Sequence, residues 1–259
     1  MTNRLTDKVA IITGAAQGIG AKMATVFAEQ GADLILLDTQ IEQLESIKDE
    51  IEKKWLNRVL IYKVDIADAN RVLEVVNEAV AFFGKIDILV NNAGINAFHD
   101  FLNMTEQEWE KCFSVNLVGT MNCCKAVLQH MVERRYGNIV NIASVHSHKI
   151  VKGAFPYTVS KHALIGLTRS LAIEFAELGI RVNSISPGLI STPLADKYFD
   201  SCSAPNIERE KQRDLIPVKR LGEPLEVANT ALFLSTDEAR FINATDILID
   251  GGRSQVYCD

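Results

Sequence analysis

A short apolar run followed at once by a glycine-rich turn most strongly limits the folds open to this chain. Residues 8–13 read Lys-Val-Ala-Ile-Ile-Thr, and residues 14–20 read Gly-Ala-Ala-Gln-Gly-Ile-Gly. Apolar residues at nearly every position are typical of a strand buried on both faces of a parallel sheet. A helical stretch follows as far as Gln30, and Gly31 is placed to end it. The segment therefore predicts a strand, a tight turn and a helix packed together.

The three glycines of the turn each permit something that a side chain would prevent. Gly14 allows the tight turn, Gly18 lets the backbone approach a ligand, and Gly20 allows close packing of helix on strand. Backbone N–H groups at the start of the helix then face an anionic group such as a pyrophosphate. The spacing G-x-x-x-G-x-G differs from the G-x-G-x-x-G dinucleotide fingerprint, so a turn without a ligand is the alternative.

Strand-like runs alternate with helical ones along the rest of the chain. With 259 residues and 47% hydrophobic content, the chain can build one large core. Such alternation is typical of right-handed β-α-β units and a parallel sheet. The fold class is therefore expected to be α/β. The further runs lie at residues 33–37, 58–64, 86–91, 138–143, 181–186 and 246–250.

Two segments carry other local signals. Thr105 and Glu108 have the spacing of a capping box, which predicts a helix that begins at Glu106 and shows helical apolar spacing as far as Met131. Residues 195–214 differ, because they are polar and lack clean periodicity.

An acidic residue, Asp38, ends the second strand, about 20 residues past the glycines. This position suits hydrogen bonds from the adenosine ribose hydroxyls of a dinucleotide. The carboxylate would repel a 2′-phosphate, and no lysine or arginine follows before Lys48. We therefore predict NAD rather than NADP as the cofactor. A solvated loop carboxylate is the alternative for Asp38.

Tyr157 and Lys161 stand four residues apart, thirteen residues after Ser144. Residues four apart share one face of a helix, and an ammonium beside a phenol favours the phenolate. We therefore expect Lys161 to lower the pKa of Tyr157, so that Tyr157 takes a proton from an alcohol or returns one to a carbonyl. Taken alone, the pair is more typical of a surface tyrosine and lysine on an amphipathic helix.

Four features occur together in this chain: the glycine turn, Asp38, the sequence Asn-Asn-Ala-Gly at 91–94, and Ser144 with Tyr157 and Lys161. Through them the chain resembles the short-chain dehydrogenase/reductase family from about Asp7 to Gly252. The resemblance implies a single doubly wound, NAD-binding Rossmann domain over residues 1–259. Its seven-stranded parallel sheet would carry helices on both faces. One departure is Asn-Ala-Thr at 243–245, where family members often have Thr-Gly.

The resemblance also implies roles for individual residues. Tyr157 would be the base, Ser144 would hold the substrate oxygen, and Asn116 would anchor a water that relays protons past Lys161. A mid-helix residue at a local kink is the alternative for Asn116, and it is compatible with the relay. The implied cofactor contacts are Gly14, Gln17, Gly18, Ile19, Gly20, Asp38, Asp65, Ile66, Asn92, Ala93, Gly94, Tyr157, Lys161, Pro187, Gly188, Ile190 and Thr192.

The substrate prediction rests on two segments. Residues 189–221 are expected to form a lid over the pocket. Residues 143–149 and 250–254 look like those of aldose 1-dehydrogenases within the family, which oxidise sugars such as L-fucose, L-galactose or L-arabinose to lactones. We therefore expect an NAD-dependent dehydrogenase that acts on a sugar hemiacetal or another secondary alcohol. The expected substrate contacts are Asn96, Ser144, His146, His148, Lys149 and Tyr157.

Two alternative functions stay open. A reductase of 3-ketoacyl thioesters would favour NADPH, which Asp38 opposes. A catalytically silent NAD-binding sensor or scaffold would need only the glycine turn and Asp38, and the complete set of Asn116, Ser144, Tyr157 and Lys161 argues against it.

Composition limits the partners. A net charge of −6 argues against a nucleic acid or an anionic membrane surface. No run is long enough to span a bilayer, and no signal-peptide core follows the first residues. We expect a cytoplasmic homotetramer or dimer, because the resemblance implies pairing of helices 106–133 and 156–177 between subunits.

Metal binding and disulfides are not expected. His146 and His148 lack a third ligand nearby in the sequence. The cysteines are odd in number and lack C-x-x-C spacing, which predicts reduced thiols. They are Cys112, Cys123, Cys124, Cys202 and Cys258.

Overall fold

A seven-stranded parallel sheet forms the centre of the protein. The computed structural model describes residues 3–256, so Cys258 lies outside the described residues. The strand order is β3-β2-β1-β4-β6-β8-β9, and every neighbouring pair is parallel. This sheet confirms the predicted α/β fold. The strands are β1 (Val9–Thr13), β2 (Asp33–Asp38), β3 (Val59–Lys63), β4 (Ile88–Asn91), β6 (Gly137–Ile142), β8 (Ile180–Pro187) and β9 (Asp246–Ile249).

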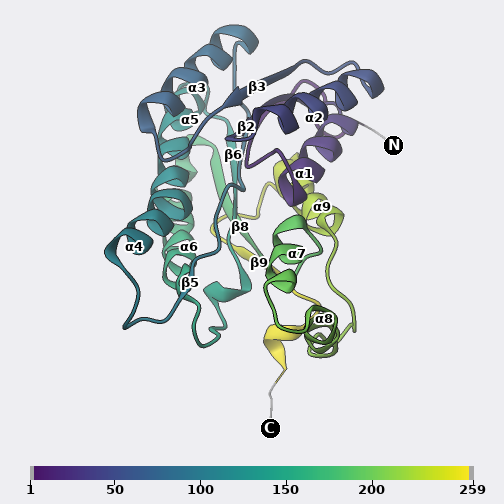
Figure 1. Ribbon diagram of the computed structural model, residues 1–259. Coiled ribbons are helices and arrows are strands. Elements are labelled where there is room, and N and C mark those ends of the chain that lie inside the picture. Colours follow the sequence, from purple (N-terminus) through teal and green to yellow (C-terminus); the bar gives the residue numbers. More distant parts are fainter. Residues whose placement is uncertain (1–2, 257–259) are drawn as a thin grey trace.

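Helices cover both faces of the sheet, three on each face (Figure 1). Ala10 and Ile12 of β1 pack into one core, whereas Val9 and Ile11 pack into the other. Burial on both faces explains why the strand is apolar at successive positions. One face carries α1 (Gly18–Glu29), α2 (Ile41–Lys54) and α9 (Pro224–Ser235); the other carries α3 (Ala69–Phe83), α5 (Thr120–Arg134) and α6 (Tyr157–Glu174). None of the helices described here has the length and apolar character needed to cross a membrane.

The strand order reverses beside β1. The chain moves outward from β1 through β2 to β3, then returns to β4 on the other side of β1. In open α/β sheets, ligands bind outside the carboxyl ends of the strands where the order reverses. The loops after β1 and β4 are therefore the first place to examine for a site.

The helix predicted to begin at Glu106 is not continuous. Its capping box is confirmed, because the Glu108 backbone N–H donates to Thr105 Oγ1 at 3.2 Å and the Thr105 N–H donates to Glu108 Oε2 at 2.8 Å. After α4 (Glu106–Phe113), a π-helical turn (Ser114–Gly119) precedes α5. π-Helical turns are rare in proteins, and those that occur are often found at functional sites. This one contains Asn116.

Two kinds of element were not indicated by the apolar pattern. The polar stretch 195–214 is mostly helical, in α7 (Pro193–Asp200) and α8 (Pro205–Asp214). Thr192 caps α7 and both helices begin with proline, a start signal that does not depend on apolar spacing. A two-stranded ribbon of β5 (Phe98–His99) and β7 (Phe155–Pro156) is too short to show any periodicity.

The turn before β9 keeps a left-handed residue without glycine. Ala244 has φ +58°, a conformation that costs an L-residue about 1–2 kcal/mol. The Asn243 side chain supports the turn, since its Oδ1 accepts from Val182 N–H at 2.9 Å and its Nδ2 donates to the Ala172 carbonyl at 3.0 Å. The sequence Asn-Ala-Thr at 243–245 therefore differs from the Thr-Gly of other family members, but the chain still forms a defined turn before β9.

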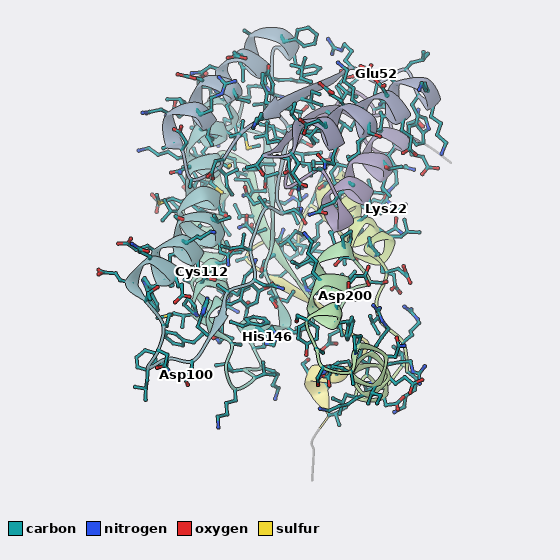
Figure 2. The ribbon with its side chains drawn as sticks, viewed as in Figure 1. Lys22, Glu52, Asp100, Cys112, His146 and Asp200 are labelled. Carbon is teal, nitrogen blue, oxygen red and sulfur yellow. The ribbon has the colours of Figure 1, made fainter. Side chains whose placement is uncertain are left out.

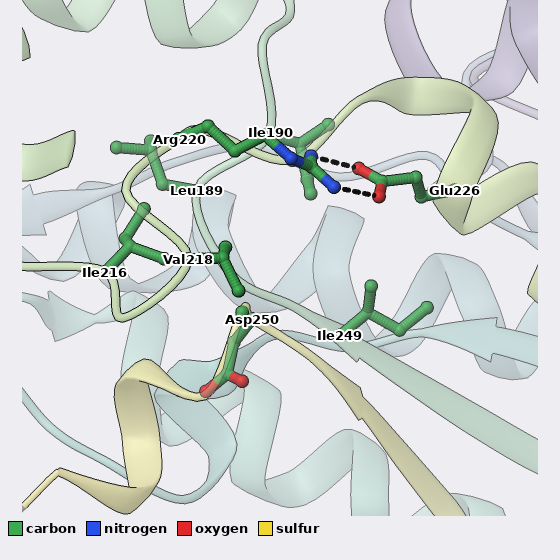
Figure 3. Close-up of a pocket in the computed structure, with 10 residues that line it drawn as sticks. Leu189, Ile190, Ile216, Val218, Arg220, Glu226, Ile249 and Asp250 are labelled. Atoms are coloured by element: carbon green, nitrogen blue, oxygen red, sulfur yellow. Dashed lines mark hydrogen bonds and ion pairs between the residues drawn. The ribbon is translucent and has the colours of Figure 1, made fainter.

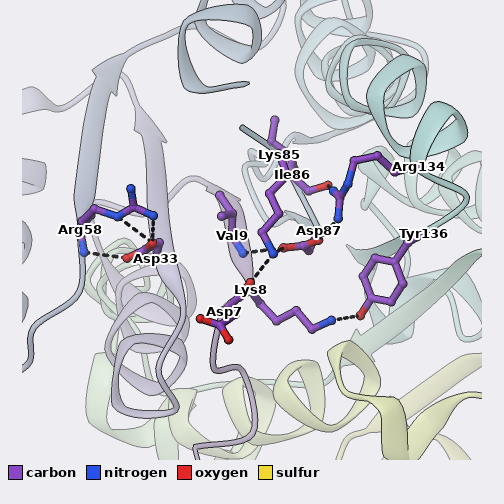
Figure 4. A network of polar contacts seen from close by, with 10 residues as sticks. All are labelled: Asp7, Lys8, Val9, Asp33, Arg58, Lys85, Ile86, Asp87, Arg134 and Tyr136. Carbon is purple, nitrogen blue, oxygen red and sulfur yellow. Dashed lines mark hydrogen bonds and ion pairs between the residues drawn. The ribbon is translucent and has the colours of Figure 1, made fainter. Parts of the chain in front are cut away.

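A buried carboxylate ties the amino edge of the sheet together (Figure 4). Asp87 is 1% exposed, and its Oδ2 accepts from the Val9 N–H at 3.0 Å. Its Oδ1 lies 2.7 Å from the Arg134 guanidinium, and Lys85 Nζ lies 3.1 Å from Oδ2. One side chain thus connects β1 with the start of β4 and with α5.

Replacement of Asp87 by alanine should lower the free energy of unfolding by about 2–4 kcal/mol. The change leaves two cations and the Val9 N–H without their shared acceptor. Chemical denaturation measures this loss. The matched control is Asp33→Ala, which breaks the more exposed ion pair with Arg58 and should cost less than about 1 kcal/mol. Equal losses in the two variants would contradict the importance given to Asp87.

Candidate active site

The glycine turn between β1 and α1 is sterically closed to larger residues. Gly14 and Gly18 have φ of +63° and +57°. A Cβ on Gly20 would lie 2.0 Å from the Gly14 carbonyl oxygen and 2.6 Å from Asn92 Nδ2. Asn92 Nδ2 donates to the Gly14 carbonyl at 2.9 Å. The turn therefore has the close backbone packing that lets amide groups at the start of α1 reach an anion.

The Thr13 hydroxyl joins the carboxyl ends of β1 and β4. It accepts hydrogen bonds from the N–H groups of Asn92 and Ala93, each at 3.0 Å. Thr13 is fully buried and was not among the predicted site residues. A hydroxyl at the last position of an otherwise apolar strand was the available signal.

Asp38 is more than a solvated loop carboxylate. Its Oδ2 accepts from the Ala16 N–H of the glycine turn at 3.0 Å, and its Oδ1 accepts from the Gln40 N–H at 3.1 Å. The Thr39 hydroxyl also donates to Oδ1, at 3.5 Å. A carboxylate has about four acceptor positions, so these three contacts leave capacity for a ribose hydroxyl. The side chain thus shapes the turn and still offers a ligand contact.

The start of α7 lies beside the glycine turn. A Cβ on Gly18 would lie 3.4 Å from Thr192 Cγ2, and Thr192 Oγ1 accepts from the Ala195 N–H at 3.2 Å. The Gly188 backbone lies against Asp250, because a Cβ there would be 2.9 Å from Asp250 Cα. Of the predicted cofactor contacts, Thr192 therefore lies beside the glycine turn, and Gly188 lies beside Asp250 at the end of β9.

The remaining predicted cofactor contacts are more scattered. Ile66 packs against Gly119 of the π-helical turn, and the Asp65 carboxylate accepts from the Ala67 N–H at 2.9 Å. Gln17 is exposed at the start of α1, Ile19 is half-buried beside it, and Ile190 pairs with Gly222. The glycine turn and Asp38 together fit a nicotinamide dinucleotide, because one supplies backbone amides to a pyrophosphate and the other supplies oxygen acceptors to a ribose.

Tyr157 and Lys161 begin α6 and are held at the carboxyl edge of β6. Lys161 is 5% exposed, and its Nζ donates to the Ile142 carbonyl at 2.9 Å. The same Nζ lies 5.7 Å from the centre of the Tyr157 ring. Ser144 is 6% exposed, and its hydroxyl lies near enough to Tyr157 to act against the rise in the Tyr157 pKa. The structure thus brings together the three residues predicted from spacing.

Asn116 connects the π-helical turn to the start of α6. Its Oδ1 accepts from the Ile95 N–H at 2.8 Å, and its Nδ2 donates to Ser160 Oγ at 3.1 Å. Ser160 Oγ in turn donates to the Tyr157 carbonyl at 2.7 Å. Ser160 is fully buried and was not among the predicted site residues.

Gly94 lies between Asn116 and Lys161. A Cβ at this position would be 3.3 Å from Asn116 Oδ1 and 3.6 Å from Lys161 Nζ. A side chain here would therefore occupy the space that separates the two groups.

Burial controls the proton affinities of both catalytic candidates. It raises the pKa of Tyr157 to about 12, against the lowering effect of the Ser144 hydrogen bond. It lowers the pKa of Lys161 to about 8. Removal from water disfavours the charged form of each group, so the two pKa values shift in opposite directions. The prediction that Lys161 lowers the pKa of Tyr157 is therefore wrong for the protein alone.

An aromatic surface continues from Tyr157. The rings of Phe98 and Tyr157 meet edge to face, with centres 5.3 Å apart, and His146 lies 6.0 Å from Tyr157. Figure 2 shows His146 between the β5 region and α7. Phe98 was not predicted, because an exposed phenylalanine in a loop-like stretch carries no sequence signal of its own.

The other predicted substrate residues are placed differently. His148 Nε2 lies 2.6 Å from Asp246 Oδ2 at the start of β9, and no described contact joins it to Tyr157. Lys149 and Asn96 are exposed. No group of three or more metal-binding side chains occurs among residues 3–256.

Comparison with known proteins gives related oxidoreductases. Residues 14–254 match the family described as enoyl-(acyl carrier protein) reductase. The chain is 41% identical over 252 residues to oxidoreductase UcpA of Salmonella typhimurium, covering 96% of this chain and 95% of that protein. It is 39% identical over 249 residues to the 3-oxoacyl-(acyl-carrier-protein) reductase FabG of Thermotoga maritima, covering 96% and 98%.

Solved structures share the whole fold. Levodione reductase superposes with a TM-score of 0.95 at 36% identity, over 98% of this chain and 100% of that chain. L-sorbose reductase from Gluconobacter frateurii, solved with NADPH and L-sorbose, superposes with a TM-score of 0.93 at 30% identity, over 99% and 100%.

Replacement of Lys161 by methionine should change how stability depends on pH. Between about pH 8 and 10.5, the unfolded chain binds more protons at Lys161 than the folded chain does. The free energy of unfolding of the wild type should therefore rise relative to Lys161→Met by up to about 1.4 kcal/mol per pH unit. Denaturation at several pH values measures this. The same change at the exposed Lys152 is the control, and parallel curves for the wild type and Lys161→Met would contradict the burial argument.

Proposed function

Because this chain belongs to the short-chain dehydrogenase/reductase family and is an oxidoreductase acting on alcohol or carbonyl groups, we propose that it oxidises a secondary alcohol or sugar hemiacetal with NAD. With an aldose, the product would be a lactone. The observation that carries the proposal is the proximity of Ser144 to Tyr157. Tyr157 itself lies one helical turn before the buried Lys161 on α6.

The chemistry assigns one task to each side chain. A bound nicotinamide would supply the hydride acceptor for oxidation or the hydride donor for reduction. Ser144 would hold the reacting oxygen of the substrate, and Tyr157 would exchange a proton with it. Because burial raises the pKa of Tyr157 to about 12, Tyr157 is protonated at neutral pH in the protein alone. It is thus set to donate a proton to a carbonyl, and oxidation should become faster as the pH rises.

Lys161 and a water anchored by Asn116 would pass protons away from Tyr157. The Lys161 and Asn116 side chains both lie within about 4 Å of the Cβ position of Gly94, which leaves a short path between them. Asn116 is fixed by Ile95 and Ser160, so this path starts from a defined geometry.

The cofactor proposal depends on charge at Asp38. L-sorbose reductase was solved with NADPH, so fold similarity leaves the choice of nicotinamide cofactor open. Asp38 supports NAD, because a carboxylate at the end of β2 would repel the 2′-phosphate of NADP if the adenosine ribose binds beside it. Residues 39–47 contain no lysine or arginine to bind such a phosphate.

Replacement of Asp38 by asparagine should shift cofactor preference toward NADP by about tenfold or more. Asparagine keeps an oxygen acceptor for the Ala16 or Gln40 N–H while it removes the charge. Repulsion between two charges a few ångströms apart is worth about 1–4 kcal/mol near a protein surface. Dissociation constants for NADH and NADPH measure the shift. An unchanged ratio would show that Asp38 does not select the cofactor.

The substrate proposal is a small polar alcohol, with a sugar as the first choice. Ser144, Tyr157 and His146 lie together, whereas Asn96 and Lys149 are exposed and His148 contacts Asp246. The similarity to L-sorbose reductase supports a sugar.

Helices α7 and α8, within residues 189–221, would form the lid. Near the end of this segment, the Arg220 guanidinium makes two hydrogen bonds to the carboxylate of Glu226 on α9, at 2.8 and 2.6 Å (Figure 3). A cavity of about 100 Å³ lies between this ion pair and Asp250. The pair would fix one end of a lid that orders over the substrate.

Reduction of a 3-ketoacyl thioester is the second candidate function. The 39% identity to FabG and the matched family favour it, and Asp38 opposes its usual cofactor. A silent NAD-binding sensor would not require the buried Ser144, Lys161 and Asn116.

Assembly as a homotetramer and a cytoplasmic location complete the proposal. Val118 in the π-helical turn, Met121 on α5 and Ile173 on α6 are exposed apolar residues available for subunit contacts. The four cysteines in the described part of the chain are unpaired, which agrees with a reducing compartment.

Replacement of Tyr157 by phenylalanine should reduce turnover by at least about 100-fold, because only the exchangeable proton is lost. NADH formation should be measured with a panel of aldoses and secondary alcohols, and NADPH consumption with an acetoacetyl thioester. NADH binding, measured by fluorescence, should remain close to the wild type. Wild-type rates in the variant would refute the role of Tyr157, and activity with the thioester alone would favour the second candidate.

A further inference from the structure

The tautomer of His146 is fixed by a backbone carbonyl. His146 lies in the 3-10 turn Val145–Ser147, and its Nδ1 is 3.1 Å from the Lys149 carbonyl oxygen. A carbonyl oxygen only accepts, so Nδ1 must carry the hydrogen. A neutral imidazole then presents Nε2 as an acceptor. Within residues 3–256, no group donates a hydrogen bond to this Nε2.

The surroundings keep the His146 ring neutral. Burial lowers the pKa of His146, the Lys149 carbonyl opposes this, and the Arg253 guanidinium lowers the pKa further. The neighbouring Tyr157 hydroxyl carries no charge at neutral pH, and Phe98 is apolar. Nε2 therefore stays an acceptor at neutral pH, and protonation would remove it only at lower pH.

The His146 ring lies close to the rings of Tyr157 and Phe98. Its ring centre lies 6.0 Å from that of Tyr157 and 6.1 Å from that of Phe98. Hydroxyl hydrogen bonds are about 2.8 Å long, so a small molecule held by Ser144 and Tyr157 can also reach His146. Phe98 is 42% exposed and offers an apolar face to the carbon skeleton.

We infer that His146 determines substrate specificity: its Nε2 accepts a hydrogen bond from a second hydroxyl of the substrate, close to the hydroxyl that reacts at Tyr157. The favoured substrate class is therefore a compact diol or cyclic polyol with an apolar ring face against Phe98. This inference rests on the proposed function, because that function places the substrate between Ser144 and Tyr157. His148 does not share the role, since Asp246 holds its Nε2.

A matched pair of substrates tests the inference. Cyclohexane-1,2-diol and cyclohexanol differ by one hydroxyl, and the ratio of their kcat/KM values with NAD⁺ isolates the contribution of that group. His146→Phe keeps an aromatic ring and removes the acceptor, so the ratio should fall about tenfold, the factor for one lost hydrogen bond. The control is His162→Phe on α6, which removes a similar ring-to-carbonyl contact, to Thr158, outside the site. It should leave the ratio unchanged.

Two further variants separate the ring nitrogens. His146→Gln extends an amide oxygen toward the Nε2 position and should restore much of the diol preference. His146→Asn reaches only the Nδ1 position and should resemble His146→Phe. An unchanged ratio in His146→Phe, or equal rescue by Asn and Gln, would overturn the inference.

Failure of the proposed function would give a different result. If neither alcohol is oxidised, calorimetric binding of the two compounds to the protein with NADH decides the inference separately. Tighter binding of the diol that is lost in His146→Phe supports the role of Nε2. Equal binding of the two compounds, or a preference that survives in His146→Phe, overturns it.

Discussion

Burial of Lys161, together with partial burial of Tyr157, is the constraint on which the candidate site depends. Helix α6 is pressed onto β6 by two polar contacts besides its apolar face. Lys161 Nζ donates to the Ile142 carbonyl, and Asn141 Nδ2 donates to Thr168 Oγ1 at 2.9 Å, two helical turns further along the same face. Both contacts are buried, so they fix the position of α6 and limit the access of solvent to Lys161 and Tyr157. Each group then favours its neutral form.

The candidate site and the buried ionic contacts of Asp87 occupy opposite edges of the same sheet. At the carboxyl edge, the turn after β1 is rich in glycine, which leaves space for a ligand. Thr13, Asp38 and Asn92 hold this turn and the loop after β4 in place by hydrogen bonds. At the amino edge, Asp87 is buried and contacts the Val9 N–H, Arg134 and Lys85. A parallel sheet permits this division, because all of its loops on one edge follow strand ends and those on the other precede strand starts.

Much of this arrangement could be predicted from the sequence because it depends on local pattern. Doubly buried strands such as 9–13 are apolar at successive positions, and the spacing of Tyr157 and Lys161 fixes them on one helix face. The direction of the Tyr157 pKa shift could not be predicted, since it depends on how several distant elements exclude water. The π-helical turn around Asn116 and the contact of His148 with Asp246 are likewise products of packing between segments far apart in the chain.

The proton affinity of Tyr157 in the protein alone can be measured directly. Protein labelled with ¹³C at the tyrosine ζ carbon gives one NMR signal per tyrosine, and a Tyr157→Phe variant assigns the signal of interest. If burial governs the site, this signal should stay in the protonated state well above pH 10 and titrate near pH 12. A midpoint at or below pH 10, the ordinary value for a solvated tyrosine, would show that Lys161 outweighs burial and would contradict the central claim.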